Sequence, residues 1–120
     1  MLWLAKWNLH CYPTDAQYIN LIRMTKRLDS VREFFGKSIT ITSGLRPWTY
    51  NTAIGGAKFS AHKTGEAVDF VVEGLDCDLA RMQLTPHLES YGIRMEDLSG
   101  SIWIHIDIRD PGNGKRFFKP

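Results

Sequence analysis

The chain has 120 residues, of which 43% are hydrophobic, and a formal net charge of +2. This length suffices for one compact domain with its own core and is too short for two, so we expect residues 1–120 to form a single domain. The weak, dispersed charge excludes nucleic acid as the default partner. A mildly basic surface still suits an anionic polymer.

The sequence contains no segment that predicts membrane insertion or export. No run approaches the roughly 18 apolar residues of a membrane span. The apolar opening, residues 1–7, is interrupted by Lys6 and does not resemble a signal peptide. Cys11 and Cys77 lack the spacing of a disulfide framework or a thiolate metal site. We therefore expect synthesis in the cytoplasm, with release by another route if the target lies outside it. The sequence carries no signal for the oligomeric state.

A long amphipathic helix is predicted first. Thr14 and Gln17 have the spacing of a capping box, and Gly36 provides a stop. Apolar residues recur between them at intervals of three to four, which predicts one face packed on the core. These residues are Tyr18, Leu21, Ile22, Leu28, Val31 and Phe35.

Strands and a second helix are predicted after this helix. Residues 38–42, 66–72 and 101–108 have strand patterns, and residues 76–91 are predicted to form a second helix ended by Gly92. Residues 116–118 are a candidate short edge strand. In 101–108, alternation places Ile102, Ile104, Ile106 and Ile108 on a core face and Trp103, His105 and Asp107 on the other. Residues 43–60 form a long loop, and long ordered loops are usually functional.

His62, Asp69 and His105 together predict a metal site. A turn at Gly65 can bring His62 over the strand that carries Asp69, and His105 arrives from a different strand. Imidazole nitrogens and a carboxylate oxygen suit zinc, and three protein ligands leave a fourth position for water. A histidine alone is more often structural or exposed, so the prediction depends on the combination.

Three motifs extend this pattern. The chain reads G-L-R-P-x-x-Y-N-x-x-I-G-G-A at residues 44–57, S-A-H-K-T-G-E-A-V-D-F at 60–70 and W-I-H-I-D at 103–107. In type and order they resemble the D-alanyl-D-alanine carboxypeptidase and L-alanyl-D-glutamate endopeptidase family. This family of zinc peptidases includes VanX- and VanY-type enzymes and phage endolysins, and the hedgehog signalling domain shares its fold. The resemblance covers about two thirds of the chain.

The resemblance implies an α+β domain with a small antiparallel sheet flanked by helices. It also implies zinc held by His62, Asp69 and His105, and hydrolysis of peptide bonds in peptidoglycan stem peptides, as a carboxypeptidase or an endolysin-type endopeptidase. Arg46 resembles the family arginine that stabilises the oxyanion. Ser60 resembles a serine that braces the site or binds substrate, although its hydroxyl equally suits the turn.

Two aromatic residues lie in the long loop. Trp48 and Tyr50 can line a groove for the substrate peptide, because rigid aromatic rings give contact area at low entropy cost. They can equally anchor the loop to the core. We take them as candidate substrate-binding residues.

One departure from the family concerns the catalytic base. The family places an acid three residues before its last histidine, where this chain has Ile102. Asp107 is the provisional base because it shares a strand face with His105, but it can instead orient His105 or pair with Arg109. Other nearby carboxylates are Glu66, Glu96 and Asp97.

The missing acid leaves a second function open, namely a non-catalytic zinc-binding module that serves as a structural or cell-wall-binding part, for example of a phage virion. The lack of an export signal favours a phage or prophage product for either function, acting on the wall after phage-type release or within a virion. A fold without metal is a third and weaker alternative.

Overall fold

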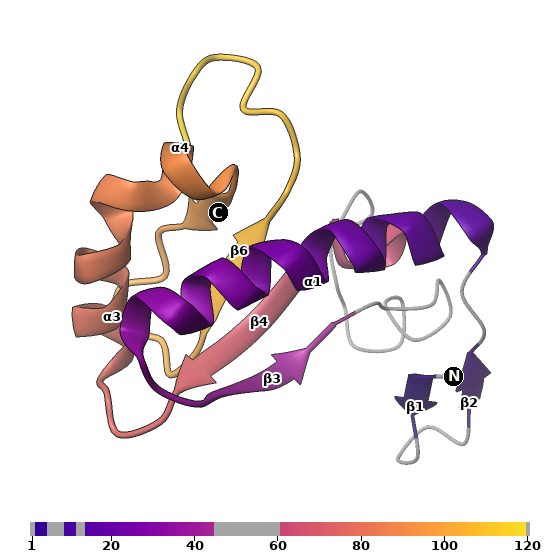
Figure 1. The fold of residues 1–120 in the computed structure, drawn as a ribbon, viewed down its shortest axis with the longest axis horizontal. Coiled ribbons are helices and arrows are strands. Elements are labelled where there is room, and N and C mark those ends of the chain that lie inside the picture. Colours follow the sequence, from indigo (N-terminus) through magenta and orange to yellow (C-terminus); the bar gives the residue numbers. More distant parts are fainter. Residues whose placement is uncertain (1, 5–8, 12–13, 45–60, 120) are drawn as a thin grey trace.

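The structure is a computed structural model of the chain, and it describes residues 2–4, 9–11, 14–44 and 61–119. Helices and strands alternate irregularly along these residues (Figure 1). The elements are β1 (Leu2–Leu4), β2 (Leu9–Cys11), α1 (Asp15–Phe35), β3 (Ile39–Ser43), the 3-10 turn η2 (Ala61–Thr64), β4 (Ala67–Val72), α3 (Cys77–Leu84), the 3-10 turn η3 (Thr85–His87), α4 (Leu88–Tyr91), β5 (Arg94–Glu96), β6 (Ile104–Asp107) and β7 (Phe117–Phe118).

Helix α1 confirms the predicted boundaries. The hydroxyl of Thr14 accepts a hydrogen bond from the backbone of Gln17, and the Gln17 side chain accepts one from the backbone of Thr14. Gly36 ends the helix in the left-handed conformation, at φ 61°. The predicted apolar face is wrong in the first half, where Tyr18 and Ile22 are 58% and 44% exposed. The buried residues of α1 are Met24 and Val31, because the turns before Met24 run on beside η2 (Figure 1).

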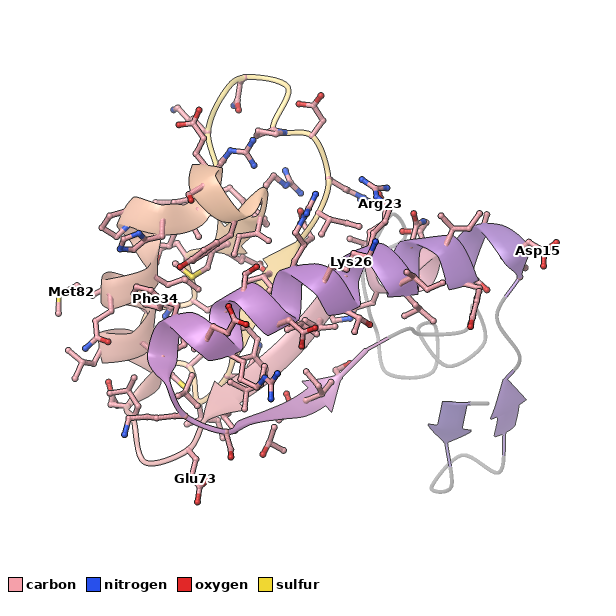
Figure 2. The ribbon with its side chains drawn as sticks, viewed as in Figure 1. Asp15, Arg23, Lys26, Phe34, Glu73 and Met82 are labelled. Carbon is pink, nitrogen blue, oxygen red and sulfur yellow. The ribbon has the colours of Figure 1, made fainter. Side chains whose placement is uncertain are left out.

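The second predicted helix is divided into three parts. Asp76 caps α3 through its side chain, and Gly92 ends α4 at φ 65°. Between them, Pro86 lies in the 3-10 turn η3, since proline cannot donate the hydrogen bond that a continuous helix requires. Phe34 of α1 packs on His87 of η3 with ring centroids 4.7 Å apart, which ties α1 to these short helices (Figure 2).

Five strands form one sheet in the order β3-β4-β6-β5-β7. All neighbouring pairs are antiparallel except β5 with β7, which are parallel. The α+β fold is therefore confirmed, and the sheet is mixed rather than purely antiparallel. Strand β5 was not predicted, because a three-residue strand with charges at both ends shows no alternating pattern long enough to recognise.

The strand predicted at 101–108 begins later than expected. Ile104 and Ile106 are fully buried, whereas Ile102 precedes β6 and is 80% exposed, so its assignment to the core is wrong. The buried guanidinium of Arg81 in α3 explains the difference. It donates to the carbonyl oxygens of Ser101 and Trp103, at 3.2 and 2.6 Å, and so holds this segment in a loop against α3.

The hydrophobic core lies between the sheet and helices α1, α3 and α4, which pack on β4, β5 and one another (Figure 1). Alternate residues of the central strands point into it, and the residues between them point to the other face. The core residues are Met24, Val31, Val68, Phe70, Val72, Ala80, Leu84, Leu88, Ile93, Met95, Ile104, Ile106 and Ile108. The helices therefore cover one face of the sheet and leave the other for polar side chains.

Strands β1 and β2 pair with each other as a separate antiparallel ladder, which the sequence did not predict. None of the helices in the described residues combines the length and apolar character needed to cross a membrane. That residues 1–120 form a single domain stays a prediction.

Candidate metal centre

The polar face of the sheet aligns several chemically important residues in one row. Asp69 of β4 is the register partner of Ser43 on one side and of His105 in β6 on the other. The antiparallel register of β5 and β6 pairs Arg94 with Asp107 and so places Glu96 beside His105. Side chains of register partners lie on the same face about 5 Å apart. The fold therefore puts carboxylate, imidazole and carboxylate next to one another across three strands.

His62 reaches the row from η2, above the sheet. The side chain of Gln17 donates to the carbonyl of Lys63 at 2.8 Å, and Asn20 donates to the carbonyl of Thr64 at 3.0 Å, so α1 holds the turn. Gly65 follows the turn at φ 78°, and a Cβ there would lie 2.9 Å from the backbone oxygen of Gln17. Only glycine fits both this conformation and this close approach.

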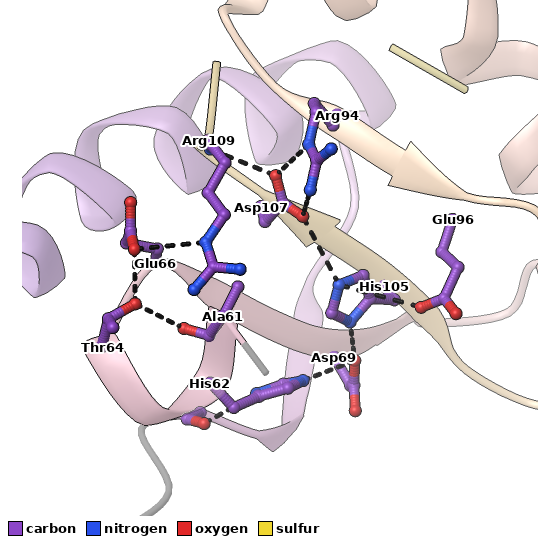
Figure 3. A network of polar contacts seen from close by, with 11 residues as sticks. Ala61, His62, Thr64, Glu66, Asp69, Arg94, Glu96, His105, Asp107 and Arg109 are labelled. Atoms are coloured by element: carbon purple, nitrogen blue, oxygen red, sulfur yellow. Dashed lines mark hydrogen bonds and ion pairs between the residues drawn. The ribbon is translucent and has the colours of Figure 1, made fainter. Parts of the chain in front are cut away.

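The three predicted ligands meet around one carboxylate oxygen. Oδ1 of Asp69 lies 2.8 Å from Nδ1 of His105 and 3.3 Å from Nε2 of His62 (Figure 3). His62, Asp69 and His105 are 2%, 7% and 9% exposed. Their ligand atoms all lie within 4.8 Å of one another. The structure thus brings together residues that the sequence separates by up to 43 positions.

The neighbours of each histidine decide which ring nitrogen faces the centre. Nδ1 of His62 lies 2.8 Å from the carbonyl oxygen of Gly44. Because a carbonyl only accepts, Nδ1 carries a proton, so Nε2 is the nitrogen that faces the centre and would bind a metal. His105 has the opposite orientation: its Nδ1 faces Asp69, and its Nε2 lies 3.8 Å from carboxylate oxygens of both Glu96 and Asp107.

The carboxylates and histidines of the cluster stabilise one another's charged forms, which shifts the pKa values of Asp69 and His105. Burial alone would raise the pKa of Asp69, but hydrogen bonds from His105 and His62 hold that pKa well below its usual range. Burial alone would lower the pKa of His105, but the carboxylates of Asp107, Asp69 and Glu96 raise it to about 9. Without a metal, His105 is therefore protonated on both nitrogens at neutral pH, and a metal bound at Nδ1 must displace a proton.

The donor set fits a zinc ion. A tetrahedral zinc ion holds nitrogen and oxygen ligands at about 2.0–2.1 Å and so places them roughly 3.3 Å apart. The observed separations of 2.8 and 3.3 Å from Asp69 are close to this spacing. Two imidazoles and one carboxylate are also a ligand set that leaves a coordination position for water. The role of these residues as metal ligands stays a prediction that the geometry supports.

Asp107, the provisional base, lies behind His105 and not beside the open centre. Its carboxylate is 1% exposed and both of its oxygens accept hydrogen bonds from Arg94, each at 2.7 Å. Burial alone would raise the pKa of Asp107, but contacts with His105 and Arg94 lower it. A carboxylate so engaged is a weak base with no access to substrate, so this geometry favours the orienting role.

The other nearby acids differ in their availability. Glu66 accepts hydrogen bonds from Thr64 at 2.5 Å and from Arg109 at 3.3 Å, which places it in a structural bracket beside η2. Glu96 is 19% exposed at its side chain, and within the described part of the chain its carboxylate is paired only with Nε2 of His105 (Figure 3). Among Glu66, Glu96 and Asp107, Glu96 is thus the carboxylate that forms no hydrogen bond with an arginine in the described part of the chain.

Four predicted residues, Arg46, Trp48, Tyr50 and Ser60, lie outside the described residues. Sequence reasoning missed two others. Arg94 was not considered, and Glu96 was placed in a loop. The signal that could have found them is the R-M-E alternation at 94–96, which puts both charges on one face of a strand if that strand is recognised.

Comparison with known proteins agrees with the site. The sequence profile described as Peptidase M15 matches residues 5–107. The chain belongs to the Peptidase M15 family. The match includes all three candidate ligands and confirms the family that the sequence motifs predicted.

The fold of this Peptidase M15 member is also found among solved structures. It is similar to the protein reported under "Structure of the LdcB LD-carboxypeptidase reveals the molecular basis of peptidoglycan recognition", with a TM-score of 0.50 and 22% identity. The similarity covers 80% of this chain but 63% of that one, so the chain spans less than two thirds of its neighbour. At this identity the likeness shows a shared fold. No curated protein matches the chain.

Proposed function

We propose that the chain is a zinc-dependent peptidase that hydrolyses peptide bonds in the stem peptides of bacterial peptidoglycan. The observation that carries the proposal is the buried set of two imidazoles around one carboxylate oxygen, formed by His62, Asp69 and His105. Membership of the Peptidase M15 family supports the reaction. The substrate is supported by the sequence motifs and by the peptidoglycan recognition reported for the structural neighbour.

The three residues would hold zinc through Nε2 of His62, Oδ1 of Asp69 and Nδ1 of His105. When bound, zinc supplies a Lewis acid that polarises the scissile carbonyl and makes water a good nucleophile near neutral pH. The protein orients these ligands from behind, through the carbonyl of Gly44 at His62 and the carboxylate of Asp107 behind His105.

Glu96 is the base that this geometry supports best. Its carboxylate lies in the same row as Asp69 and His105, it is partly exposed, and within the described residues it accepts no hydrogen bond from an arginine. We infer that an oxygen of Glu96 takes a proton from the attacking water and then delivers it to the departing amine. Asp107 lacks both the exposure and the unoccupied oxygen that this role requires.

Residues of the long loop complete the proposed mechanism. We propose that Arg46 stabilises the oxyanion and that Ser60, Trp48 and Tyr50 contact the substrate, as the family motifs imply. Truncation of each side chain to alanine separates these roles. Arg46→Ala should lower kcat, whereas loss of an aromatic contact should mainly raise KM.

The proposal is tested by incubating the protein with purified peptidoglycan and with a synthetic stem peptide and identifying the products by mass spectrometry. Wild type is compared with His105→Ala and with His87→Ala, which removes an exposed histidine on η3 far along the chain from the site. We expect a newly cleaved peptide bond with wild type and His87→Ala, and none with His105→Ala. Equal product from all three proteins would refute the assignment.

A non-catalytic zinc-binding module is the second candidate, because an exposed Ile102 stands where the family has its acid. Such a module would serve as a structural or wall-binding part, for example of a virion. It predicts stoichiometric zinc and binding to sacculi, but no cleavage by wild type. A protein that retains less than one zinc per chain after purification without chelator would instead indicate a fold without metal.

Peptidoglycan hydrolysis and wall binding both require access to the cell wall. We propose that it reaches the wall by phage-type release or as part of a virion. Detection of the protein by mass spectrometry in purified virions, compared with the lysate supernatant, would distinguish the two routes.

A further inference from the structure

We propose that Arg94 is a positioning residue of this centre: through Asp107 it fixes the Nε2 side of His105, so that Nδ1 is the nitrogen available to a metal ion. The inference rests on the proposed zinc site. It adds a residue outside the three motifs and assigns to it an effect on metal binding.

The contact between Arg94 and Asp107 is a two-pronged ion pair. The two residues are register partners on β5 and β6, and Nε and Nη2 of Arg94 donate to separate oxygens of Asp107, each at 2.7 Å. The backbone of Arg109 donates a third hydrogen bond at 3.1 Å. Paired donors of this kind fix both the charge and the orientation of a carboxylate. Asp107 therefore stays ionised at a position where it is 1% exposed.

Arg94 is itself held in place from the edge of the sheet. Its guanidinium lies over the ring of Phe118 in β7, 4.4 Å from the ring centroid. The same ring meets His105 edge-on at 6.3 Å. We call the series of contacts from Arg94 through Asp107 to His105 the relay. Phe118 thus contacts both of its end residues, Arg94 and His105. The planar guanidinium can bind a carboxylate and stack on an aromatic ring at the same time, which a lysine cannot do equally well.

The relay acts on His105 by electrostatics. Oδ2 of Asp107 lies 3.8 Å from Nε2 of His105, at ion-pair distance and beyond hydrogen-bond distance. A fixed negative charge on this side of the ring holds Nε2 toward Asp107 and so keeps Nδ1 facing Asp69, where it is the nitrogen available to a metal ion. Without Arg94, Asp107 would be a buried carboxylate that has lost the two hydrogen bonds fixing its orientation, so its position beside His105 would no longer be held.

Arg109 does not share this role, although it lies two residues from Asp107. Its side chain turns to Glu66, with Nε 3.3 Å from the carboxylate, and its hydrogen bond to Asp107 comes from the backbone N–H. Figure 3 shows the two arginines on opposite sides of Asp107, and the side chain of Arg109 runs from there toward Glu66 and η2. The two guanidiniums therefore support different parts of the centre.

The first test is the zinc affinity of the metal-free protein, measured by competition with a chromogenic chelator. Arg94→Met should lower the affinity by about 10- to 100-fold, the usual loss when a residue behind a metal ligand is removed. Arg94→Lys should fall between wild type and Arg94→Met, because lysine restores the charge without the fork. Arg116→Met is the matched control: Arg116 donates to the carbonyl of Ile93, away from Asp107, and its loss should leave the affinity within about twofold.

The second test identifies the coordinating nitrogen directly. In the 15N-labelled protein loaded with 113Cd, coupling should connect the metal to Nδ1 of His105 and Nε2 of His62. Coordination of wild type through Nε2 of His105 would overturn the inference, and this measurement does not require any variant to fold. An Arg94→Met protein with unchanged zinc affinity and unchanged coupling would overturn it as well.

Failure of this inference is distinct from failure of the proposed function. If Arg94→Met binds zinc as wild type does and wild type still cleaves the stem peptide, only the role of Arg94 is lost. If wild type binds no zinc at all, the metal centre itself is refuted and Arg94 has nothing to position.

Discussion

The two halves of the candidate centre are supported in different ways. Asp69 and His105 are register partners on central strands whose opposite faces form the hydrophobic core, so their separation is fixed by the sheet. His62 lies on a one-turn helix that α1 holds through side-chain hydrogen bonds from Gln17 and Asn20 to its backbone. We call these the strand half and the turn half. One half depends on the core, and the other depends on a few polar contacts.

Because of this difference, substitutions in the turn half should change zinc affinity with little change in the stability of the sheet. A change in the strand half disturbs buried neighbours and the carboxylates behind His105. A change in the turn half should move His62 while the sheet remains folded, because the contacts that it removes are outside the core. Substitutions in the two halves should therefore differ in whether stability falls together with zinc affinity.

The largest effect is expected at Glu96, at the end of the strand half. Glu96→Gln keeps the size of the side chain and removes its basicity, so kcat should fall by about 10²- to 10⁴-fold. Zinc content should stay near wild type, since the three ligands are intact. Steady-state kinetics on a stem peptide, together with elemental analysis, provides the measurement.

Asp107→Asn is the matched comparison for Glu96→Gln. It removes a charge from the other carboxylate at the same distance from Nε2 of His105. We expect it to reduce zinc affinity more than kcat measured at saturating zinc. Activity of Glu96→Gln close to wild type would rule out Glu96 as the base and return attention to the long loop.

The next effect concerns pH and belongs to the strand half. His105 has a pKa of about 9 without metal, so zinc must displace its proton at lower pH. Zinc affinity should therefore rise about tenfold per pH unit well below pH 9, and about 50-fold between pH 7 and pH 9. Titrations in buffers that do not bind zinc would measure this slope. An affinity independent of pH over this range would show that His105 is already neutral.

The same pKa shifts predict how the stability of the metal-free protein varies with pH. The pKa of His105 is higher in the folded chain than its ordinary value of 6.5, so its contribution is complete below about pH 6.5 and is lost as pH rises through about 9. Asp69 has a lowered pKa, so its contribution is present above about pH 4 and is lost in acid. Thermal unfolding without metal should show the highest midpoint between these limits, and added zinc should remove the fall above pH 7.

A smaller effect is expected from Gly65→Ala in the turn half. The positive φ costs an alanine about 1–2 kcal/mol, and the new Cβ meets the backbone oxygen of Gln17. Gly74→Ala is the control, because Gly74 has a similar φ of 69° with nothing within 4 Å of its Cβ. Zinc affinity should fall for Gly65→Ala alone, while both variants lose some stability in urea unfolding. Equal zinc affinities would mean that η2 does not position His62.

The smallest effect is expected from Asn20→Ala. It removes one hydrogen bond to the backbone of Thr64, with a net contribution of about 0.5–1.5 kcal/mol, and should weaken zinc binding about two- to tenfold. Thr25→Ala removes a hydrogen bond of similar length that stays within α1 and should leave zinc binding unchanged. If Asn20→Ala and Thr25→Ala have the same zinc affinity, the hydrogen bond from Asn20 to Thr64 is not needed to hold the turn half in place.

Local sequence was sufficient for the parts of the molecule that are defined locally. The capping box at Thr14 and the stop at Gly36 predicted α1, and the order of His62, Asp69 and His105 predicted residues that the fold then brings together. Family membership also followed from short motifs. The helix boundaries depend on residues that are neighbours in sequence. The ligand set and the motifs contain combinations of residue types that occur in few kinds of site.

The parts that failed depend on contacts between distant residues. Ile102 was placed on the core by alternation, but Arg81 from α3 holds that segment as a loop. The pairing of Arg94 with Asp107 requires the register of β5 with β6, which no local pattern encodes. Asp107 was proposed as the base because it shares a strand face with His105, and its ion pair with Arg94, which argues against that role, depends on the same register.

The loop before β6 is held by its backbone carbonyls, through the buried guanidinium of Arg81. Its exposed side chains therefore contribute little to its conformation, and Ile102 in particular can be exchanged at small cost to the fold. In protein engineering terms, this is a site adjoining the metal centre where new side chains can be introduced on a fixed backbone. Ile102→Glu, which restores the acid typical of the family, is the natural first variant for changing how this centre handles protons.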